Sequence, residues 1–474
     1  MRLLLVGAFP FPPEQGSQVY FQEQALALRA AGAHVHLLTY GPGRPELGLP
    51  QTTLPAWAVP RSRRSGPSLG KPLADLVLAA RLRRRVASGP TAASRAADSA
   101  ETASASGRAS GSASWDASEN ASGTASKRAS SAASSTGFDA ILAHHAEAAL
   151  AALHALPRSR PPIVYCAHTL LGEELPLYFQ SPRDQLVDRE PGASGRALAW
   201  LGGGLDRWIA RRADGWVALT QTAERVMRAS SGAPGRRIGP PVADPDGGRA
   251  LPDDAALLAA HALERRGFFL YCGNLDPYQD LPLLEQVARA RAAAGSPERR
   301  TEARGDRVRS LPLVVATHAL RGAATDPPGS RPVADARALA QVGRLAQAGV
   351  RVVPIGSAAE ARALFAGARA TIVPRRSLGG FPIKLVNSLA AGTPVVAYHG
   401  EEWGLVDGHE ALVADLDDPV ASLAAALTRL ERDPALAERL GQGARAHYGS
   451  EHRPALVAAA TLELIRAVAA RRDR

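Results

Sequence analysis

Polar residues that could bind a phosphorylated or hydroxylated ligand follow apolar segments, at positions where the carboxyl ends of strands are expected. His168 ends one such segment, and Gly273, Asn274 and Gln279 follow another within the sequence GNLDPYQD. A histidine at a strand end can donate a hydrogen bond to a phosphate or a sugar hydroxyl, and a glycine permits a sharp turn there. The alternatives are a histidine satisfied by loop backbone and an ordinary turn capped by an aspartate.

The segment GFPIKLVNSLAAGTPVVA at residues 380–397 carries the strongest signal. A Gly-Gly turn precedes a predicted helix that has Pro382 near its first turn and ends at Gly392. The free N–H groups of a first turn and the positive end of the helix dipole favour a diphosphate. Lys384 would add charge and is one of only three lysines in the chain. A surface lysine on an exposed helix face is the alternative. The residues expected to bind here are Gly380, Phe381, Pro382, Ile383 and Lys384.

A third segment, AFPFPPEQGS at residues 8–17, follows the first predicted strand and leads into a helix. Gly16 would let a backbone N–H approach a ligand, and the helix start at Ser17 favours an anion. An ordinary Pro/Gly turn is the alternative. The segment is not a G-x-G-x-x-G motif and no acidic residue ends the second predicted strand, which disfavours binding of a nicotinamide dinucleotide.

Two further histidines, His144 and His145, end another predicted strand and carry less weight than His168. The spacing of these three histidines does not indicate a metal site. No acidic D-x-D pair stands at a predicted strand end. We therefore expect neither a metal ion nor a cofactor.

Strands and helices must bring these segments together. Apolar segments alternate with helical periodicity in both halves of the chain, which predicts βαβ units and an α/β fold of two Rossmann-like, doubly wound domains facing across a cleft. The domains are expected at 1–240 and 251–450, with a helix at 451–474 that packs back on the first. Ligands of such sheets bind beyond the carboxyl ends of the strands. Strands are expected at residues 3–6, 35–39, 140–143, 163–167, 216–219, 268–272, 313–316, 350–353, 371–373 and 395–398, and terminal helices at 419–447 and 454–472.

Residues from about 87 to 136 interrupt this alternation. They are almost entirely Ala, Ser, Gly and Thr. Such a composition buries too little apolar area to offset the entropy of ordering. We expect a disordered insertion within the first domain.

The composition limits the classes of partner. The net charge of +11 would attract nucleic acid, anionic membranes or phosphorylated substrates. The charge is scattered apart from small clusters at Arg61–Arg64 and Arg81–Arg85, and no zinc finger, RNA-recognition signature or basic zipper is present. We expect no nucleic-acid partner, and favour a solvated surface or a contact with anionic lipid.

The cysteines and the N-terminus indicate the compartment. Cys166 and Cys272 each lie within an apolar segment, which is typical of a reducing environment. The opening MRLLLVG resembles a short strand and not a signal peptide, and no run of about 18 apolar residues suits a membrane span. We expect a cytoplasmic protein, with peripheral association at the inner face of the membrane as an option.

One stretch could serve such an association. Leu198, Trp200, Leu201, Leu205, Trp208 and Ile209 lie close together in the sequence. They would suit contact with a lipid-borne substrate at a membrane surface. The alternative, which we favour slightly, is a helix that faces the core of the first domain.

The sequence resembles glycosyltransferase family 4, the retaining glycosyltransferases of the GT-B fold, at the loop ending at Gly16, at the strand end at His168, and in the segments GNLDPYQD and GFPIKLVNSLAAGTPVVA. The order and spacing of these loops agree over most of the chain outside the inserted loops, and Glu401–Asp415 resembles the loop and strand that follow in the family. The resemblance implies transfer of a sugar from a nucleotide-diphosphate sugar to an acceptor hydroxyl, with retention of anomeric configuration. The acceptor would be a glycan or a lipid-linked glycan.

The family pattern differs here at four positions. Two glutamates usually stand eight positions apart where this chain has Gly379 and Asn387, and an Arg and a Lys usually stand where it has Asn274 and Gln279. The resemblance implies that Asn387 holds ribose through its amide and that Lys384 replaces the lost charge, with Arg375 or Arg376 as alternatives. His168 would face the sugar or the phosphate.

Two rival interpretations remain open from the sequence. The departures at Gly379 and Asn387 would also suit a catalytically inactive relative that binds a nucleotide sugar or acts as a partner protein. A two-domain oxidoreductase or epimerase is the second, and the missing dinucleotide motif disfavours it.

Overall fold

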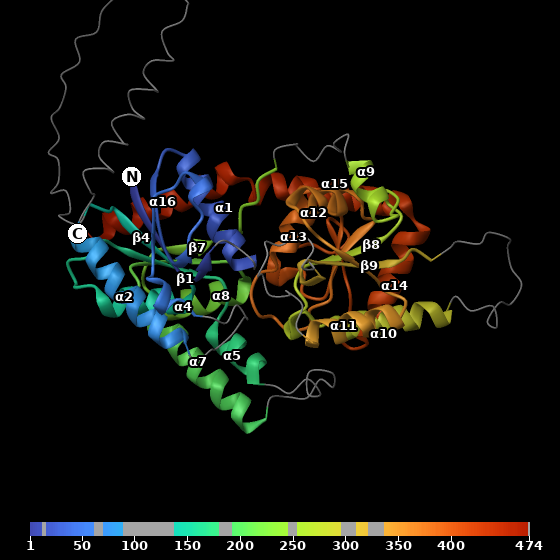
Figure 1. Cartoon of the computed structure of the whole chain (residues 1–474), viewed down its shortest axis with the longest axis horizontal. Helices are drawn as coiled ribbons and strands as arrows, with labels where there is room; N and C mark the ends of the chain where they lie inside the picture. The colour runs from blue at the N-terminus through green and yellow to red at the C-terminus, as the bar shows by residue number, and fades with distance from the viewer. Residues whose placement is uncertain are drawn as a thin grey trace, which may run out of the picture.

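The chain folds into two α/β domains that lie side by side, and its last helix returns to the first domain (Figure 1). All strand pairs of the two sheets are parallel. The expected pair of doubly wound domains is therefore confirmed. The computed structural model describes residues 1–11, 16–60, 70–88, 137–179, 192–244, 254–294, 310–320 and 336–472.

The N-terminal sheet has the strand order β3-β2-β1-β4-β5-β6-β7 among the described residues. The strand order of the sheet reverses between β1 and β4, because β2 and β3 lie on one side of β1 and the later strands on the other. Ligands of such sheets bind at the carboxyl ends of the two strands where the order reverses. The strands are β1 Arg2–Phe11, β2 His34–Pro42, β3 Gln51–Thr53, β4 Ala140–His144, β5 Ile163–Ala167, β6 Gly215–Ala218 and β7 Gly235–Arg237. The helices are α1 Gly16–Ala30, α2 Lys71–Ser88, α4 His145–Ala155, α5 Leu171–Phe179, α7 Ala193–Arg212 and α8 Gln221–Ser230, with short 3₁₀ turns at Pro45–Leu47 and Ala56–Ala58.

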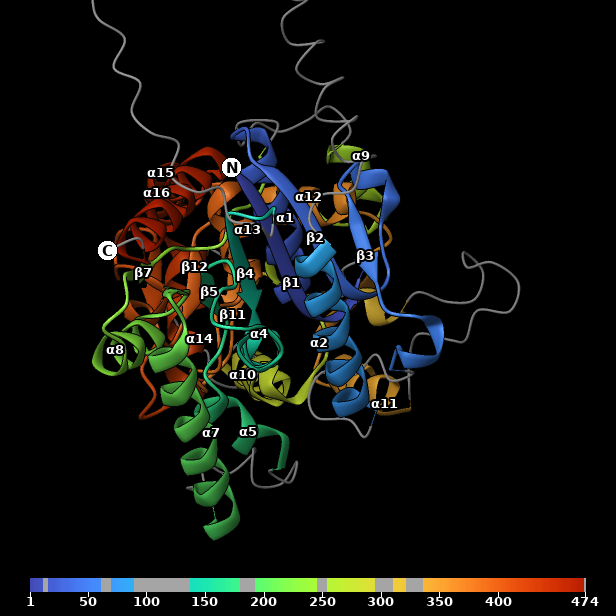
Figure 2. The same cartoon turned by 90° about the vertical axis from the view of Figure 1, so that its left-hand side faces the viewer.

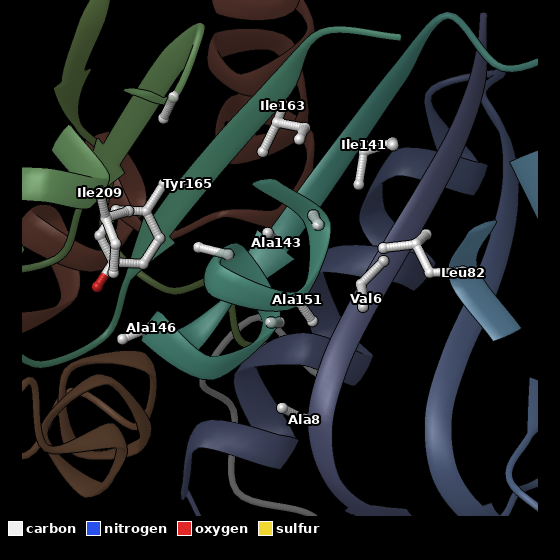
Figure 3. Packing of buried hydrophobic residues seen from close by; sticks show 14 of the residues in the cluster. Val6, Ala8, Leu82, Ile141, Ala143, Ala146, Ala151, Ile163, Tyr165 and Ile209 are labelled. Atoms are coloured by element: carbon white, nitrogen blue, oxygen red, sulfur yellow. The ribbon is translucent and has the colours of Figure 1, made fainter. Parts of the chain in front are cut away.

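Alternation along each strand divides the core of this domain into two layers. Val6, Ile141 and Tyr165 point to one face, where α2, α4, α7 and α8 cover them (Figure 3). Leu3 and Leu5 point to the other face, where α1 and the C-terminal helix α16 cover them. The central strands β4, β5 and β6 are thus buried on both sides, as is usual in a parallel sheet, while the edge strands β3 and β7 are not fully buried.

The C-terminal sheet has the order β10-β9-β8-β11-β12-β13 in the part of the chain that the structure describes. Its carboxyl edge holds the loops after β8 and β11. The strands are β8 Phe269–Cys272, β9 Leu313–Thr317, β10 Arg351–Pro354, β11 Ala370–Val373, β12 Val395–Ala397 and β13 Ala411–Val413. The helices are α9 Asp254–Ala260, α10 Leu281–Ala294, α11 Ala336–Gln347, α12 Ala358–Gly367, α13 Ile383–Ala390, α14 Pro419–Arg432 and α15 Pro434–Glu451, with 3₁₀ turns at Pro277–Gln279, His318–Leu320 and Glu401–Trp403.

The single helix expected at 419–447 is wrong. Two helices, α14 and α15, meet at Asp433, which has the non-helical φ of −125° and accepts a hydrogen bond from the N–H of Leu436. Pro434 follows, and proline cannot continue the hydrogen bonding of the preceding helix. The last helix, α16 (Pro454–Arg472), packs Val457, Ile465 and Val468 against the N-terminal sheet.

Polar contacts join the two domains at their facing edges. The Glu402 carboxylate accepts hydrogen bonds from the backbone N–H of Thr222 at 3.0 Å and from its hydroxyl at 2.8 Å. His452, between α15 and α16, donates from Nδ1 to the carbonyl of Pro240 at 2.9 Å. The side chains of Glu402 and His452 are both buried, and their contacts fix how the two domains meet.

Two expectations concern the insertion in the first domain and a membrane span. The insertion expected at 87–136 lies outside the described residues except for Ala87 and Ser88, which belong to α2 and so are not disordered. Among the described residues, no helix has the length and apolar character that a membrane span requires.

The apolar stretch on α7 faces the core only at its C-terminal end. Ile209 is buried, whereas Trp200 is 72 % exposed and Leu201 52 % exposed. The first part of α7 extends beyond the body of the domain, so it has no core to face (Figure 2). The preference for a core-facing helix is thus wrong for the first part of the stretch.

Candidate functional site

The start of α13 in the C-terminal domain lies directly against the N-terminal domain. A Cβ added to Gly380, whose φ is +75°, would lie 2.4 Å from the Thr169 methyl and 3.1 Å from the His168 carbonyl oxygen. A Cβ on Gly16 would lie 3.0 Å from the Ile383 side chain, which itself packs in the N-terminal core. Only a residue without a side chain permits such an approach at Gly380. Gly16, His168, Gly380 and Ile383 therefore meet where the two domains join.

Lys384 is buried at this junction. Its ammonium donates to Gln279 Oε1 at 2.7 Å and lies 3.7 Å from the centre of the Tyr271 ring. Burial, and then the charge of Arg375, hold the pKa of Lys384 well below its usual range. The expectation of a cation at the helix start is met by a lysine that is shielded from solvent.

Arg375 is a second buried cation beside Lys384. It is 4 % exposed, donates to the Gly380 carbonyl at 3.0 Å and has its guanidinium 5.1 Å from the centre of the Tyr278 ring. Arg376, by contrast, is neutralised by Asp280. Within the described parts of the chain, neither Arg375 nor Lys384 forms an ion pair with a carboxylate. Two basic groups, whose positive charges would repel each other, are thus buried together.

The first turn of α13 adds to this positive charge. Pro382 is the N-cap residue, and no side chain caps the helix. Leu385 N–H already donates to the Pro382 carbonyl at 2.9 Å, and the N–H groups of Ile383 and Lys384 are the donors of that turn with no acceptor among the described residues. Asn387, one turn further on, is half-buried, and no hydrogen bond of its side chain is found among the described residues.

The loop after β8 carries Gln279, which accepts the hydrogen bond from Lys384. Gly273 has a φ of +154°, and a Cβ there would lie 3.2 Å from Lys384 Nζ, so the position requires glycine. The Asn274 amide donates to the Asp276 carboxylate at 2.6 Å and to the Tyr278 hydroxyl at 3.2 Å. Asn274 thereby stiffens its own loop, while Gln279 reaches Lys384.

The N-terminal domain contributes a cluster of imidazoles. His144 Nδ1 and His168 Nε2 are 2.8 Å apart, and the ring of His145 stacks on that of His168 with centroids 4.2 Å apart. The Tyr20 ring of α1 lies 4.7 Å from the His168 ring. Burial is the main reason that the pKa values of His144 and His168 are well below the usual range, so both rings are neutral near pH 7.

The remaining predicted residues lie around this junction. Gly16 is exposed and Ser17 half-buried at the start of α1, and residues 12–15 of the same loop lie outside the described residues. Phe381 is half-buried, and its ring centroid is 5.9 Å from that of His452. A Cβ on Gly379 would lie 3.2 Å from the Leu177 side chain of the N-terminal domain.

Sequence reasoning gave too little weight to two of these residues. His144 matters because β4 and β5 are neighbours, so the histidines at their carboxyl ends come into contact. Arg375 and Arg376 are equivalent in the sequence, and only the structure separates the buried one from the one paired with Asp280. In the described ranges, no group of three or more His, Cys, Asp or Glu side chains is arranged so that it could hold a metal ion.

Comparison with known proteins gives the following matches. Residues 15–240 match the glycosyl transferase 4-like domain, and residues 319–433 match the glycosyl transferases group 1 domain. No curated protein matches the chain by sequence.

Solved structures share the whole architecture. Sucrose-phosphate synthase from Thermosynechococcus elongatus is 17 % identical with a TM-score of 0.62, and the match covers 98 % of each chain. HepE from Anabaena in complex with UDP is 14 % identical with a TM-score of 0.59, over 98 % of this chain and all of that one. WaaG, a glycosyltransferase involved in lipopolysaccharide biosynthesis, is 13 % identical with a TM-score of 0.57, over 98 % and 99 % of the two chains. The fold is therefore GT-B, and together with the two domain matches it identifies the chain as a glycosyltransferase of the GT-B superfamily.

Proposed function

We propose that the chain transfers a sugar from a nucleotide-diphosphate sugar to an acceptor hydroxyl and retains the anomeric configuration, as glycosyltransferase family 4 does. One observation carries the proposal: Lys384 and Arg375 are buried together without a carboxylate partner in the described chain, beside an uncapped helix start. A buried, unpaired charge is costly, so an anion that completes the pair stabilises the protein. A diphosphate suits two cations and a row of backbone N–H groups.

The same groups would assist the reaction. When the sugar leaves, negative charge develops on the nucleoside diphosphate, and fixed positive groups in a dry site stabilise it most effectively. We assign this role to Lys384 and to the N–H groups of the first turn of α13, with Arg375 behind them. Because these groups already supply two positive charges, the proposal needs no metal ion and no cofactor.

Other residues would hold the rest of the sugar donor. Asn387 has a side chain without a partner among the described residues, one turn from Lys384, and we assign it to the ribose hydroxyls. Gln279 fixes the Lys384 ammonium through a 2.7 Å hydrogen bond. His168 and the loop ending at Gly16 and Ser17 approach from the N-terminal domain, where they would contact the sugar or the phosphates.

A nucleotide-sugar panel tests this proposal. Thermal shifts with UDP-, GDP- and ADP-sugars should single out one nucleotide class, and the protein should then release that nucleoside diphosphate when an acceptor is present. NMR of the product should show that the anomeric configuration is unchanged. Binding of a nucleotide sugar with neither hydrolysis nor transfer, over a range of acceptors, would contradict the transferase proposal.

We also propose that the acceptor is a lipid-linked glycan at an anionic membrane surface. Trp200, Leu201 and Leu205 are exposed on α7. The only acidic residue of this helix, Asp206, is buried, where it accepts hydrogen bonds from the N–H groups of Leu171 and Gly172. The remaining charges of α7 are arginines, which complement anionic lipid.

Vesicle sedimentation tests the membrane proposal. The protein should co-sediment with phosphatidylglycerol vesicles and much less with phosphatidylcholine vesicles, and the Trp200→Ser/Leu201→Ser variant should lose binding. The matched control is Leu339→Ser, which changes an apolar residue that is 54 % exposed on α11 of the other domain. Equal binding of both variants would contradict a role for α7.

A further inference from the structure

Two buried histidines form a pair at the carboxyl edge of the N-terminal sheet. His144 ends β4 and is fully buried, and His168 follows β5 and is 3 % exposed. His144 Nδ1 and His168 Nε2 lie 2.8 Å apart, which is a hydrogen bond between two ring nitrogens. The other nitrogens, His144 Nε2 and His168 Nδ1, are buried and have no hydrogen-bond partner among the described residues.

This contact couples the protonation of the two rings. A neutral imidazole has one N–H and one bare nitrogen, so one ring must donate and the other must accept. If His144 donates from Nδ1, the proton of His168 is on Nδ1. If His168 donates from Nε2, the proton of His144 is on Nε2. In both states the two rings carry their protons on the same type of nitrogen.

The two histidines differ in their contact with the other domain. Aromatic rings flank both: the centroid of His144 lies 4.9 Å from that of Phe21 and 5.5 Å from that of Tyr20, and the centroid of His168 lies 4.7 Å from that of Tyr20 and 4.2 Å from that of His145. Of the pair, His168 also borders the domain junction, where its carbonyl oxygen lies against Gly380. An anion bound at this junction would therefore offer its acceptor to His168 and not to His144. Such an anion favours the state in which His168 carries its proton on Nδ1.

We propose that His144 is a positioning residue that holds the proton of His168 on Nδ1, so that His168 donates a hydrogen bond to a phosphate oxygen of the sugar donor. This inference rests on the proposed function for its ligand. The coupling between the rings depends only on the contact between His144 and His168.

Nitrogen-15 NMR of the labelled full-length protein reads the tautomers directly. In the free protein both rings should carry the proton on the same type of nitrogen, and with saturating pyrophosphate both should carry it on Nδ1. Pyrophosphate is the probe because every nucleotide-diphosphate sugar contains it. Protons on opposite types of nitrogen in the two rings, or His168 with a bare Nδ1 when pyrophosphate is bound, would overturn the proposal.

Matched substitutions separate positioning from packing. His144→Asn places an amide where Nδ1 was and should keep pyrophosphate affinity near wild type, whereas His144→Leu should weaken it about tenfold, the effect of losing one charge-assisted hydrogen bond. His168→Gln keeps an amide at the position of Nε2 but loses Nδ1, and it should weaken binding by a similar factor. Because both changes remove one interaction, the double variant His144→Leu/His168→Gln should bind no more weakly than either single variant.

The outcomes distinguish this inference from the proposed function. Additive losses in the double variant, or equal affinities of His144→Asn and His144→Leu, would mean that His144 only packs. If the wild-type protein binds no pyrophosphate, the proposed sugar-donor site is wrong and so is the role of His168 there. Matched tautomers in the free protein would still support the coupling in that case.

Discussion

Replacing Lys384 with methionine should weaken binding of a nucleoside diphosphate while leaving the ligand-free protein folded. Methionine keeps the unbranched shape and removes the charge together with the N–H donors of the ammonium. A hydrogen bond to a charged group contributes about 1.5–3 kcal/mol, so its loss should raise the dissociation constant roughly 10- to 150-fold. The measurement is isothermal titration with whichever of UDP, GDP and ADP most stabilises the wild-type protein.

Two opposing effects set the stability of the ligand-free variant. The substitution removes the contacts of Lys384 with Gln279 and the Tyr271 ring, and it also removes a buried ammonium that repels Arg375. We expect these to cancel to within about 1 kcal/mol. At a ligand concentration of about 100 times the dissociation constant, the wild-type protein gains about 2.7 kcal/mol from binding. A tenfold weaker variant gains about 1.4 kcal/mol at that concentration.

The pH dependence has a defined sign. Because the pKa of Lys384 is depressed in the free protein, affinity for the anion should fall as the pH rises through that depressed pKa, below the range in which an ordinary lysine titrates. Lys384→Met should lack this dependence. The control is Lys71→Met, which removes a lysine that already pairs with Glu147 in the N-terminal domain. Equal affinity of wild type and Lys384→Met, with loss only in Lys71→Met, would refute the reasoning.

Three further predictions concern the junction between the domains. Gly380→Ala should lower activity at least tenfold, because the added Cβ would meet the N-terminal domain. The control is Gly408→Ala, where φ is also +75° but no atom lies within 4 Å of the added Cβ. This variant should lose only about 1 kcal/mol of stability in urea unfolding. Glu402→Gln should lower the free energy of unfolding by about 1–3 kcal/mol, because Thr222 loses a charged acceptor; an unchanged value would show that this contact does not hold the domains together. Burial lowers the pKa of His452 to about 4. The neutral ring therefore contributes up to about 3 kcal/mol to the free energy of unfolding above pH 6.5, and this contribution is lost as the pH falls towards 4. His452→Gln should flatten that part of the stability curve, and an unchanged slope would assign the loss to other groups.

Much of the fold was predictable because the strands of a parallel sheet are buried on both faces. The apolar segment at Ile163–Ala167 is a strand with those same ends. The three-residue strands β3 and β7 were missed, whereas β13 lies within Glu401–Asp415, where the resemblance implied a loop and a strand. Gln51–Thr53 and Gly235–Arg237 contain no aliphatic residue, so only pairing with a neighbouring strand makes them strands.

The candidate site was predictable in its loops but not in its contacts. Gly380 and Lys384 were identified from the sequence because a glycine permits a turn before a helix and a lysine adds positive charge at the helix start. The pairing of His144 with His168 depends on which strands are neighbours. The burial of Arg375 without a carboxylate partner among the described residues depends on the packing of Tyr278 and the backbone of Gly380 around it. Both are tertiary features that no local pattern encodes.

A crystal structure of the protein with the bound nucleoside diphosphate tests the central claim most directly. We predict that the diphosphate lies at the start of α13, within hydrogen-bond distance of Lys384 Nζ and of a backbone N–H of the first turn. Phosphates bound elsewhere, with Lys384 still bonded only to Gln279, would contradict the account.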